Sequence, residues 1–200
     1  MSEFLWKPAL SEVENSQSWE FIQEANKKFK VNLKNFHDLY KWSCDFPEFF
    51  WEHFWHYSKI ISERNSNKVL KNGHDFLGSE WFPDARLNFA KNLLAKRDET
   101  PAIIFWGEDK YKSSLTHLEL FNQVAKLANW LKQNGVKKGD RVAGLLPNMP
   151  EAVVSMLAAS SIGAIWTSCS PDFGVQGVLD RFSQIEPSVF ICVDAYLYNG

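Results

Sequence analysis

From residue 140 onward, short apolar segments alternate with helical patterns, and this alternation restricts the fold more than any other feature of the sequence. The apolar segments are residues 141–146, 164–168 and 189–193, which recur at intervals of about 23–25 residues. Neighbouring parallel strands need a long connection, which is usually a helix. The spacing therefore predicts an α/β fold with a mostly parallel sheet and right-handed crossovers.

The residues just before this region predict a hairpin followed by a helix. Ala102–Trp106 and Tyr111–Leu115 are the paired strands. Thr116 and Glu119 have the spacing of a capping box at a helix start, and Gly135 stands where a left-handed residue commonly ends a helix. The inward face of this helix is predicted to carry Leu118, Phe121, Val124, Ala125, Ala128 and Leu131.

The amino-terminal part of the sequence predicts helices. Ser16 or Ser18 can cap one helix, and Asn35 can cap a second one. Pro47 suits the first turn of a third helix. The second helix is predicted to place Phe36, Leu39 and Tyr40 on one side. The third is aromatic on several faces and needs a large partner surface, which we expect the α/β part to provide.

The polar segment 62–73 interrupts both patterns. We therefore predict a helical, aromatic-rich segment over residues 1–72 and the beginning of a large α/β domain over residues 73–200. No helix follows the last predicted strand within these 200 residues. Because a parallel strand needs cover on both faces, we expect the sheet to be incomplete.

Charge and composition exclude several classes of function. The sequence has 22 basic and 24 acidic residues and lacks the long basic stripe that nucleic-acid binding requires. Its most apolar stretch, residues 152–166, is shorter than the ~20 residues of a membrane span. Three separated cysteines fit a reducing compartment, and the first residues do not form a signal peptide. We expect a cytoplasmic protein that binds neither nucleic acid nor membranes.

Few residues form a recognisable catalytic pattern. The sequence contains neither GxxxxGK[ST] nor GxGxxG. His53 and His56 have the spacing of two metal ligands on a helix, but no third ligand is evident, so packed or surface histidines are expected. Cys169 and His117 could form a thiol–imidazole pair, although nothing in the sequence brings them together.

The segment Ser168–Gly174 is the most informative candidate for a ligand site. It joins the carboxyl end of a predicted strand to the amino end of a predicted helix, where N–H groups favour anions. Ser170 and Asp172 are also ordinary helix caps, and the spacing favours capping over ligand binding. Arg181 on the following helix can be a surface residue in a salt bridge.

Longer stretches of the sequence resemble a known family. Residues 42–55 (WSCDFPEFFWEHFW) resemble the amino-terminal segment of acetyl-CoA synthetase-like enzymes, and residues 135–152 (GVKKGDRVAGLLPNMPEA) resemble the start of the adenylate-forming superfamily's large domain. Residues 81–94 (WFPDARLNFAKNLL) and 163–187 (GAIWTSCSPDFGVQGVLDRFSQIEP) are most similar to acetoacetate–CoA ligases. The resemblance runs through nearly the whole chain and implies the amino-terminal third of such an enzyme.

In that family a carboxylate attacks the α-phosphate of ATP to give an acyl-adenylate, and the thiol of CoA then displaces AMP. The resemblance implies acetoacetate, ATP, Mg²⁺ and CoA as the small molecules of the full-length enzyme. The family's phosphate loop, ribose-binding aspartate and catalytic lysine lie downstream of the matching region. Residues 1–200 alone are therefore expected to be inactive and to bind none of these molecules. We assign no catalytic or metal-binding residue.

The resemblance assigns one site, a part of the CoA-binding wall. A Phe-Gly-Gly stretch that lies against the CoA nucleotide in acetyl-specific members aligns with Ser170, Pro171 and Asp172. An arginine that meets a CoA phosphate in those members aligns with Tyr198, which cannot supply the charge. Asp172 adds a negative charge near a polyanion.

Two other interpretations stay open. The chain could be a free-standing, non-catalytic α/β module that interacts with other proteins, or an unrelated nucleotide-binding domain, which the missing phosphate loop disfavours. A reading frame that continues past Gly200 into a Ser/Thr/Gly-rich loop would favour the ligase. A stop codon there would favour the module.

Overall fold

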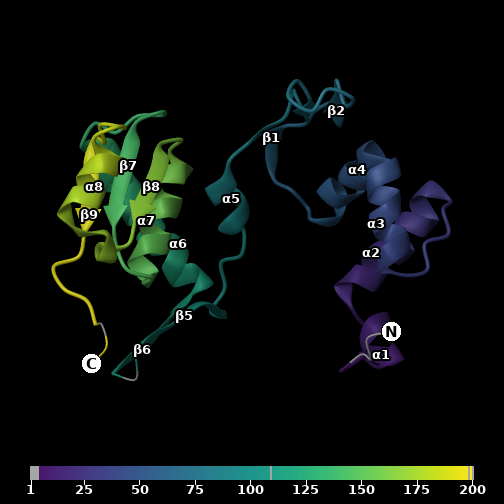
Figure 1. Cartoon of the computed structure of the whole chain (residues 1–200), viewed down its shortest axis with the longest axis horizontal. Helices are drawn as coiled ribbons and strands as arrows, with labels where there is room; N and C mark the ends of the chain where they lie inside the picture. The colour runs from purple at the N-terminus through teal and green to yellow at the C-terminus, as the bar shows by residue number, and fades with distance from the viewer. Residues whose placement is uncertain (1–4, 109, 198, 200) are drawn as a thin grey trace. The chain divides into compact units, whose positions relative to one another are not determined.

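The computed structural model describes residues 5–108, 110–197 and 199, and it divides into two compact units, Met1–Arg86 and Leu87–Gly200 (Figure 1). Each unit has a buried apolar core of its own. The division by compactness falls later than the predicted boundary after residue 72, and the assignment of domains to those ranges stays a prediction.

The first unit is mostly helical. Its helices are α1 (Leu10–Glu14), α2 (Gln17–Phe29), α3 (Phe36–Asp45) and α4 (Pro47–Tyr57). Very short strands follow, namely β1 (Ser62–Arg64), β2 (Leu70–Lys71), β3 (Glu80–Trp81) and β4 (Arg86–Leu87), which spans the division. Strands β2 and β3 pair antiparallel.

The predicted helix starts of this unit are confirmed. The Ser16 hydroxyl oxygen accepts a hydrogen bond from the Trp19 N–H at 3.2 Å, and Asn35 Oδ1 accepts one from the Asp38 N–H at 3.0 Å. Pro47 begins α4. These caps satisfy N–H groups that a helix leaves unpaired in its first turn.

The core of the first unit is built around the aromatic ring of Phe21, on α2. The ring centroid of Phe21 lies 5.7 Å from that of Phe50 and 4.3 Å from that of His53. Tyr57 lies edge-on at 5.1 Å. Edge-to-face and tilted ring pairs add to the free energy of burial, so α4 is fixed onto α2 mainly by its rings. The buried apolar residues of this core are Phe21, Ile22, Ala25, Leu33, Leu39 and Trp42.

The buried face of α3 differs from the prediction. Leu39 is buried as expected, but Phe36 and Tyr40 are exposed, and Trp42 is buried instead. Leu39 and Trp42 lie three positions apart and share a face. At 100° per residue, Phe36 and Tyr40 are turned roughly 90–130° from the centre of that face, which leaves them in solvent.

The aromatic helix α4 finds partner surface inside the first unit. The ring of Trp51 lies 5.8 Å from that of Trp81, and the ring of Trp55 lies 4.5 Å from that of Phe82. The segment after residue 62 therefore covers part of α4. The packing of this helix onto the α/β part stays a prediction.

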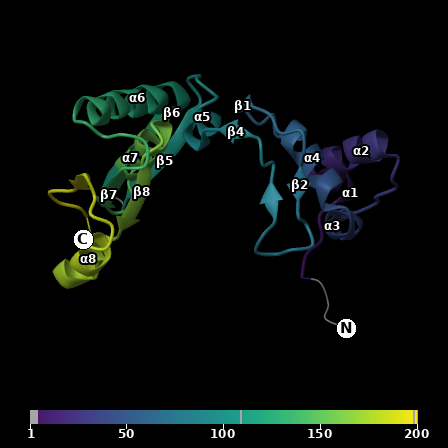
Figure 2. The same cartoon turned by 90° about the horizontal axis from the view of Figure 1, so that it is seen from above.

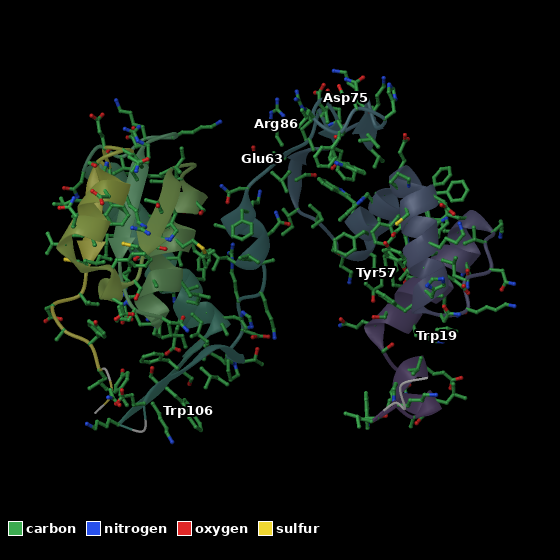
Figure 3. All side chains as sticks on the ribbon, viewed as in Figure 1. Trp19, Tyr57, Glu63, Asp75, Arg86 and Trp106 are labelled. Atoms are coloured by element: carbon green, nitrogen blue, oxygen red, sulfur yellow. The ribbon has the colours of Figure 1, made fainter. Side chains whose placement is uncertain are left out.

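The second unit contains the predicted hairpin and parallel sheet. After α5 (Phe89–Leu93), strands β5 (Pro101–Gly107) and β6 (Tyr111–Thr116) pair antiparallel, with Ile104 opposite Ser114. Trp106 stands near the turn of this hairpin and is 63% exposed (Figure 3). The remaining elements are α6 (His117–Gln133), β7 (Arg141–Leu145), α7 (Pro150–Ser161), β8 (Ile165–Cys169), η1 (Pro171–Phe173), α8 (Gly174–Phe182) and β9 (Val189–Cys192).

The sheet has the strand order β8-β7-β9, and both pairings are parallel, as predicted. Val142 and Ala143 of the central strand are fully buried on opposite faces. Val142 belongs to the larger core that α6 and α7 cover, whereas Ala143 packs with Phe182 of α8. Figure 2 shows α6 and α8 on opposite sides of the sheet. The fold is thus an α/β layer structure with helices on both faces.

Both predicted ends of α6 are confirmed, but one residue predicted to face inward is exposed. The Thr116 and Glu119 side chains form the reciprocal capping box, and Gly135 has a φ of 86°. Ala125, however, is exposed, and Leu120 is buried in its place. Leaving a small alanine in water forfeits less apolar burial than leaving a leucine there, so the helix turns Leu120 inward.

Gly144 of β7 has no side chain, and the ring of Trp166 occupies the space where one would lie. A Cβ added to Gly144 would lie 2.3 Å from the ring of Trp166 on β8. The glycine therefore lets this tryptophan lie flat over the middle of the sheet. Within the described ranges, every helix is too short or too polar to cross a lipid bilayer.

Candidate functional site

The carboxyl edge of the parallel sheet is where the fold places a ligand. The chain runs from β7 to β8 on one side and then crosses to β9 on the other side, so the direction of winding reverses at β7. In open α/β sheets, ligands bind outside the carboxyl ends of the strands at such a reversal. The loops at this edge are residues 146–149, 170–174 and 193–197.

A cavity of about 400 Å³ opens beside the reversal point. The loop after β7, the loop after β9 and the β5–β6 hairpin line it. Its wall is largely aromatic and apolar, and it includes Phe105, Tyr111, Pro147, Asn148, Met149 and Tyr196. No sequence motif predicts this cavity, because the hairpin and the loop after β9 that line it are far apart in the sequence.

The predicted site residues Ser170, Pro171 and Asp172 lie in the loop after β8. Ser170 caps η1, because its hydroxyl oxygen accepts a bond from the Asp172 N–H at 3.4 Å. Pro171 takes the first position of η1. Asp172 does not cap α8, whose start at Gly174 has no side-chain cap. The expectation of a cap is therefore confirmed for Ser170 and wrong for Asp172, because a short 3₁₀ turn intervenes.

The Asp172 carboxylate has two hydroxyl partners. Ser170 Oγ donates to Asp172 Oδ2 at 2.7 Å, and the Tyr196 hydroxyl donates to Asp172 Oδ1 at 3.3 Å. Ser170 and Pro171 are half-buried, and Asp172 is exposed. The structure thus brings the three predicted residues together and adds Tyr196, which sequence reasoning had not singled out.

Arg181 takes a different role from the predicted salt bridge. Its guanidinium lies over the ring of Phe173, with the carbon 4.0 Å from the ring centroid, and donates to the Gly177 carbonyl oxygen at 2.9 Å. The cation therefore stabilises the start of α8 through a ring contact. This contact places a positive charge beside the Ser170–Gly174 loop.

The loop chemistry suits some of the implied small molecules and not others. Asp172 would repel a phosphate, and Tyr198, aligned with the phosphate-binding arginine, lies outside the described residues. Residues 170–174 contain the Ser170 hydroxyl group and carry no basic side chain. Elsewhere in the part of the chain that the structure describes, no group of three or more His, Cys, Asp or Glu side chains is placed to hold a metal ion.

The structure separates the proposed thiol–imidazole pair into different environments. Cys169 is buried in an apolar cluster with Ala143 and Phe182. His117 begins α6, and its backbone N–H donates to the Thr100 carbonyl oxygen at 3.0 Å. Cys169 is therefore a core residue, as buried cysteines in strands commonly are.

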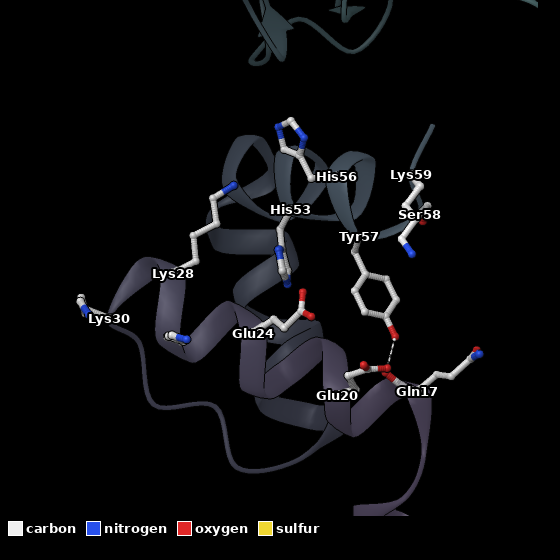
Figure 4. Close-up of a pocket in the computed structure, with 11 residues that line it drawn as sticks. Gln17, Glu20, Glu24, Lys28, Lys30, His53, His56, Tyr57, Ser58 and Lys59 are labelled. Atoms are coloured by element: carbon white, nitrogen blue, oxygen red, sulfur yellow. Dashed lines mark hydrogen bonds between the residues drawn. The ribbon is translucent and has the colours of Figure 1, made fainter. Parts of the chain in front are cut away.

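A cavity of about 1060 Å³ in the first unit is an open surface hollow between α2 and α4 (Figure 4). His53 is buried there and donates from Nε2 to the Phe21 carbonyl oxygen at 3.1 Å, whereas His56 is exposed. Tyr57 donates to Glu20 Oε2 at 3.0 Å. The charged rim carries both signs, namely Glu20, Glu24, Lys27, Lys28, Lys30 and Lys59. The histidines are thus a packed and a surface residue, as expected.

Comparison with known proteins agrees with this geometry. The family model described as AMP-binding enzyme matches residues 89–199, and the model described as acetyl-coenzyme A synthetase N-terminus matches residues 36–93. The first match spans more than half of the chain. The chain therefore belongs to the family of AMP-binding enzymes.

Within that family, the chain is similar to individual acyl-CoA synthetases. The acetoacetyl-coenzyme A synthetase of Rhizobium meliloti is 46% identical over 196 residues, which are 98% of this chain and 30% of that protein. The malonamoyl-CoA synthetase of Penicillium aethiopicum is 37% identical over 205 residues, 99% of this chain and 28% of that protein.

Among solved structures, the acetoacetyl-CoA synthetase from Streptomyces lividans matches with a TM-score of 0.91 and 37% identity. The match covers 98% of this chain and 31% of that one. The resemblance predicted from the sequence is confirmed. The chain spans about 30% of the length of the curated relatives that it matches.

Proposed function

We propose that this chain supplies the amino-terminal part of an acyl-CoA synthetase that converts acetoacetate, ATP and CoA into acetoacetyl-CoA, AMP and pyrophosphate. The observation that carries the proposal is the 46% identity to an acetoacetyl-coenzyme A synthetase along 98% of the chain. Two further observations support it, the parallel sheet with its open carboxyl edge and the structural match to the Streptomyces lividans enzyme.

In this proposal the chain binds and does not itself carry the reacting groups. Ser170, Pro171 and Asp172 form one wall of the CoA site, and they face a neutral part of CoA, because the Asp172 carboxylate disfavours a phosphate. ATP and Mg²⁺ are held by the downstream parts of the enzyme, where the family's phosphate loop, ribose-binding aspartate and catalytic lysine lie. We place the enzyme in the cytoplasm, since its three cysteines are free.

The relatives also suggest the class of acid. In both acetoacetate and malonamate, one methylene group separates the carboxylate from a second carbonyl group at C3. The two acids differ in the group on that carbonyl, which is a methyl group in acetoacetate and an amino group in malonamate. An acyl site that accepts one is close in shape to a site that accepts the other. We therefore propose short 3-carbonyl carboxylic acids as the substrate class, with acetoacetate first because the more similar relative is named for it.

An apolar groove on the second unit favours a second candidate function, a non-catalytic module that binds another protein. About 490 Å³ of space lies against α8 and β9, and it is lined by apolar side chains such as Val178, Leu179 and Phe182. Phe190 in the same groove is 48% exposed. Exposed apolar surface of this kind binds another polypeptide. That polypeptide could be the rest of a synthetase or a separate partner.

A chimera separates these functions. Residues 1–200 of this chain would replace the matching region of the Rhizobium meliloti enzyme, and AMP formation would be measured with acetoacetate, ATP and CoA. The proposal expects acetoacetate-dependent AMP formation, whereas residues 1–200 alone should give none above a protein-free control. A chimera that folds, as judged by circular dichroism and a single hydrodynamic species, but forms no AMP would support the non-catalytic module.

A further inference from the structure

One side-chain hydrogen bond joins the loop after β8 to the loop after β9. The Tyr196 hydroxyl donates to Asp172 Oδ1 at 3.3 Å across a separation of 24 residues. Strands β8 and β9 are not neighbours, because β7 lies between them. The bond therefore crosses the end of the central strand, at the carboxyl edge where the direction of winding reverses.

The remaining polar contacts of this loop are local. Ser170 Oγ donates to Asp172 Oδ2 at 2.7 Å, and Phe173 lies under the Arg181 guanidinium of α8. Among the side-chain contacts of the described residues, the bond from Tyr196 is thus the polar link from the loop to a different segment of the sheet edge. With Ser170 and Tyr196 bonded to separate oxygens, the Asp172 carboxylate is held in a single orientation.

Tyr196 also forms part of the wall of the 400 Å³ cavity beside the β5–β6 hairpin. Its ring contributes to the cavity, and its hydroxyl reaches the Ser170–Gly174 loop. A group that enters the cavity would therefore meet the residue that holds the loop.

We propose that Ser170, Asp172 and Tyr196 form a clasp that fixes the loop after β8 against the loop after β9, and that Tyr196 is a positioning residue for CoA. The second part rests on the proposed function, and the first part does not. In the clasp, Asp172 acts as a hydrogen-bond acceptor, and its charge is not needed to hold the loop. Removing the Tyr196 hydroxyl releases the loop, whereas neutralising Asp172 without changing its shape does not.

Hydrogen–deuterium exchange on the 200-residue chain tests the clasp directly. Tyr196→Phe should speed exchange of the Asp172, Phe173 and Gly174 amides by about three- to ten-fold, since local opening becomes easier when a hydrogen bond is lost. Asp172→Ala should likewise speed exchange over residues 194–197. Asp172→Asn should stay close to wild type, because its amide oxygen accepts from Tyr196 and its N–H group can donate to Ser170 Oγ.

Asp180→Asn is the matched control. Asp180 is an aspartate on α8 that accepts a bond from the Gln176 side chain and takes no part in the clasp. Exchange over 172–174 that is unchanged in Tyr196→Phe, or that rises equally in Asp180→Asn, would overturn the clasp.

Kinetics in the chimera test the positioning role. Tyr196→Phe and Asp172→Ala should each raise the KM for CoA by about three- to ten-fold, with kcat and the KM for ATP nearly unchanged. The double variant should be no worse than Asp172→Ala alone, because that variant already lacks the bond to Tyr196. A rise in the KM for CoA in Asp172→Asn equal to that in Asp172→Ala would show a charge effect and overturn the positioning role. Loss of all activity in the parental chimera would contradict the proposed function, and exchange would still decide the clasp.

Discussion

The two compact units bury different kinds of side chain. In the first unit the core is a set of rings centred on Phe21, supplied by short helices. In the second unit the core is aliphatic, and Leu131, Val142 and Leu157 are its largest fully buried side chains. Phe182 is the aromatic residue among its buried core side chains, whereas Trp106 is 63% exposed. A core of short helices thus relies on a few large ring contacts, whereas a core on a layered sheet distributes burial over many smaller side chains.

The units also satisfy buried polar groups in different ways. The sheet of the second unit pairs its backbone groups through parallel ladders. The first unit uses side chains instead. Asn26 accepts from the Leu33 N–H at 2.7 Å and donates to the Leu33 carbonyl oxygen at 2.9 Å, and His53 donates to the Phe21 carbonyl oxygen. The comparison teaches that single substitutions of large or polar side chains should affect the first unit most.

The largest effect is expected at the centre of the aromatic core. Phe21→Ala should lower the free energy of unfolding of the first unit by about 3–5 kcal/mol, because it removes the α2 ring that packs against Phe50, His53 and Tyr57 of α4. Denaturant-dependent hydrogen exchange of α2 and α4 measures this change. The control is Phe76→Ala, at a position that is 94% exposed. Equal midpoints for the two variants would contradict the ring-centred core.

The next effect tests the aliphatic core of the second unit. Leu157 of α7 is 2% exposed, and Leu157→Ala should cost about 2–5 kcal/mol, with exchange protection lost in α6, α7 and β7. Because the two cores are separate, protection of α2 should persist. Val175→Ala, at a position 79% exposed, is the control. Simultaneous loss of protection in α2 and α7 would show that the units unfold together, and the comparison would fail.

A smaller effect is expected for the side chain that pairs with Leu33. Asn26→Ala should cost about 1–3 kcal/mol, because it leaves two backbone groups without partners. Asn26→Asp keeps the acceptor for the Leu33 N–H and loses the donor, so its cost should fall between wild type and alanine. Chemical denaturation of the three proteins measures the order. An aspartate variant less stable than the alanine variant would contradict this account.

The smallest effect concerns pH. Desolvation and then the hydrogen bond to Glu20 raise the pKa of Tyr57 above its ordinary value of 10.0. The neutral phenol is thus favoured in the folded state, and its contribution to stability is full below pH 10 and lost as the pH rises through the folded-state pKa. Tyr57→Phe should flatten the alkaline loss of stability in the first unit.

The second unit provides the opposite case. The Thr100 hydroxyl lowers the pKa of Asp98 below its ordinary value of 3.8, so the contribution of Asp98 is present above that pH and lost as the pH falls. Thermal unfolding against pH, followed in each unit, measures both effects. Parallel pH profiles for wild type, Tyr57→Phe and Asp98→Asn would contradict the assignment.

The sequence alone determined those parts of the structure that depend on residues close together in the chain. The caps at Ser16, Asn35 and Thr116, the left-handed Gly135 and the strand–helix spacing after residue 140 all predicted elements that the structure confirms. Caps and periodicity act within one or two turns, so they need no information from distant residues. The family followed from such local stretches as well.

Tertiary structure decided which faces are buried and how the candidate site is assembled. The exposure of Tyr40 and Ala125 depends on which neighbour each helix meets, and periodicity alone does not give that neighbour. The bond between Tyr196 and Asp172 joins loops from strands that are not adjacent, and the cavity adds a hairpin from earlier in the chain. Such contacts form only when the sheet brings its carboxyl edge together. For this reason the sequence marked Ser170, Pro171 and Asp172 but not the tyrosine that holds them.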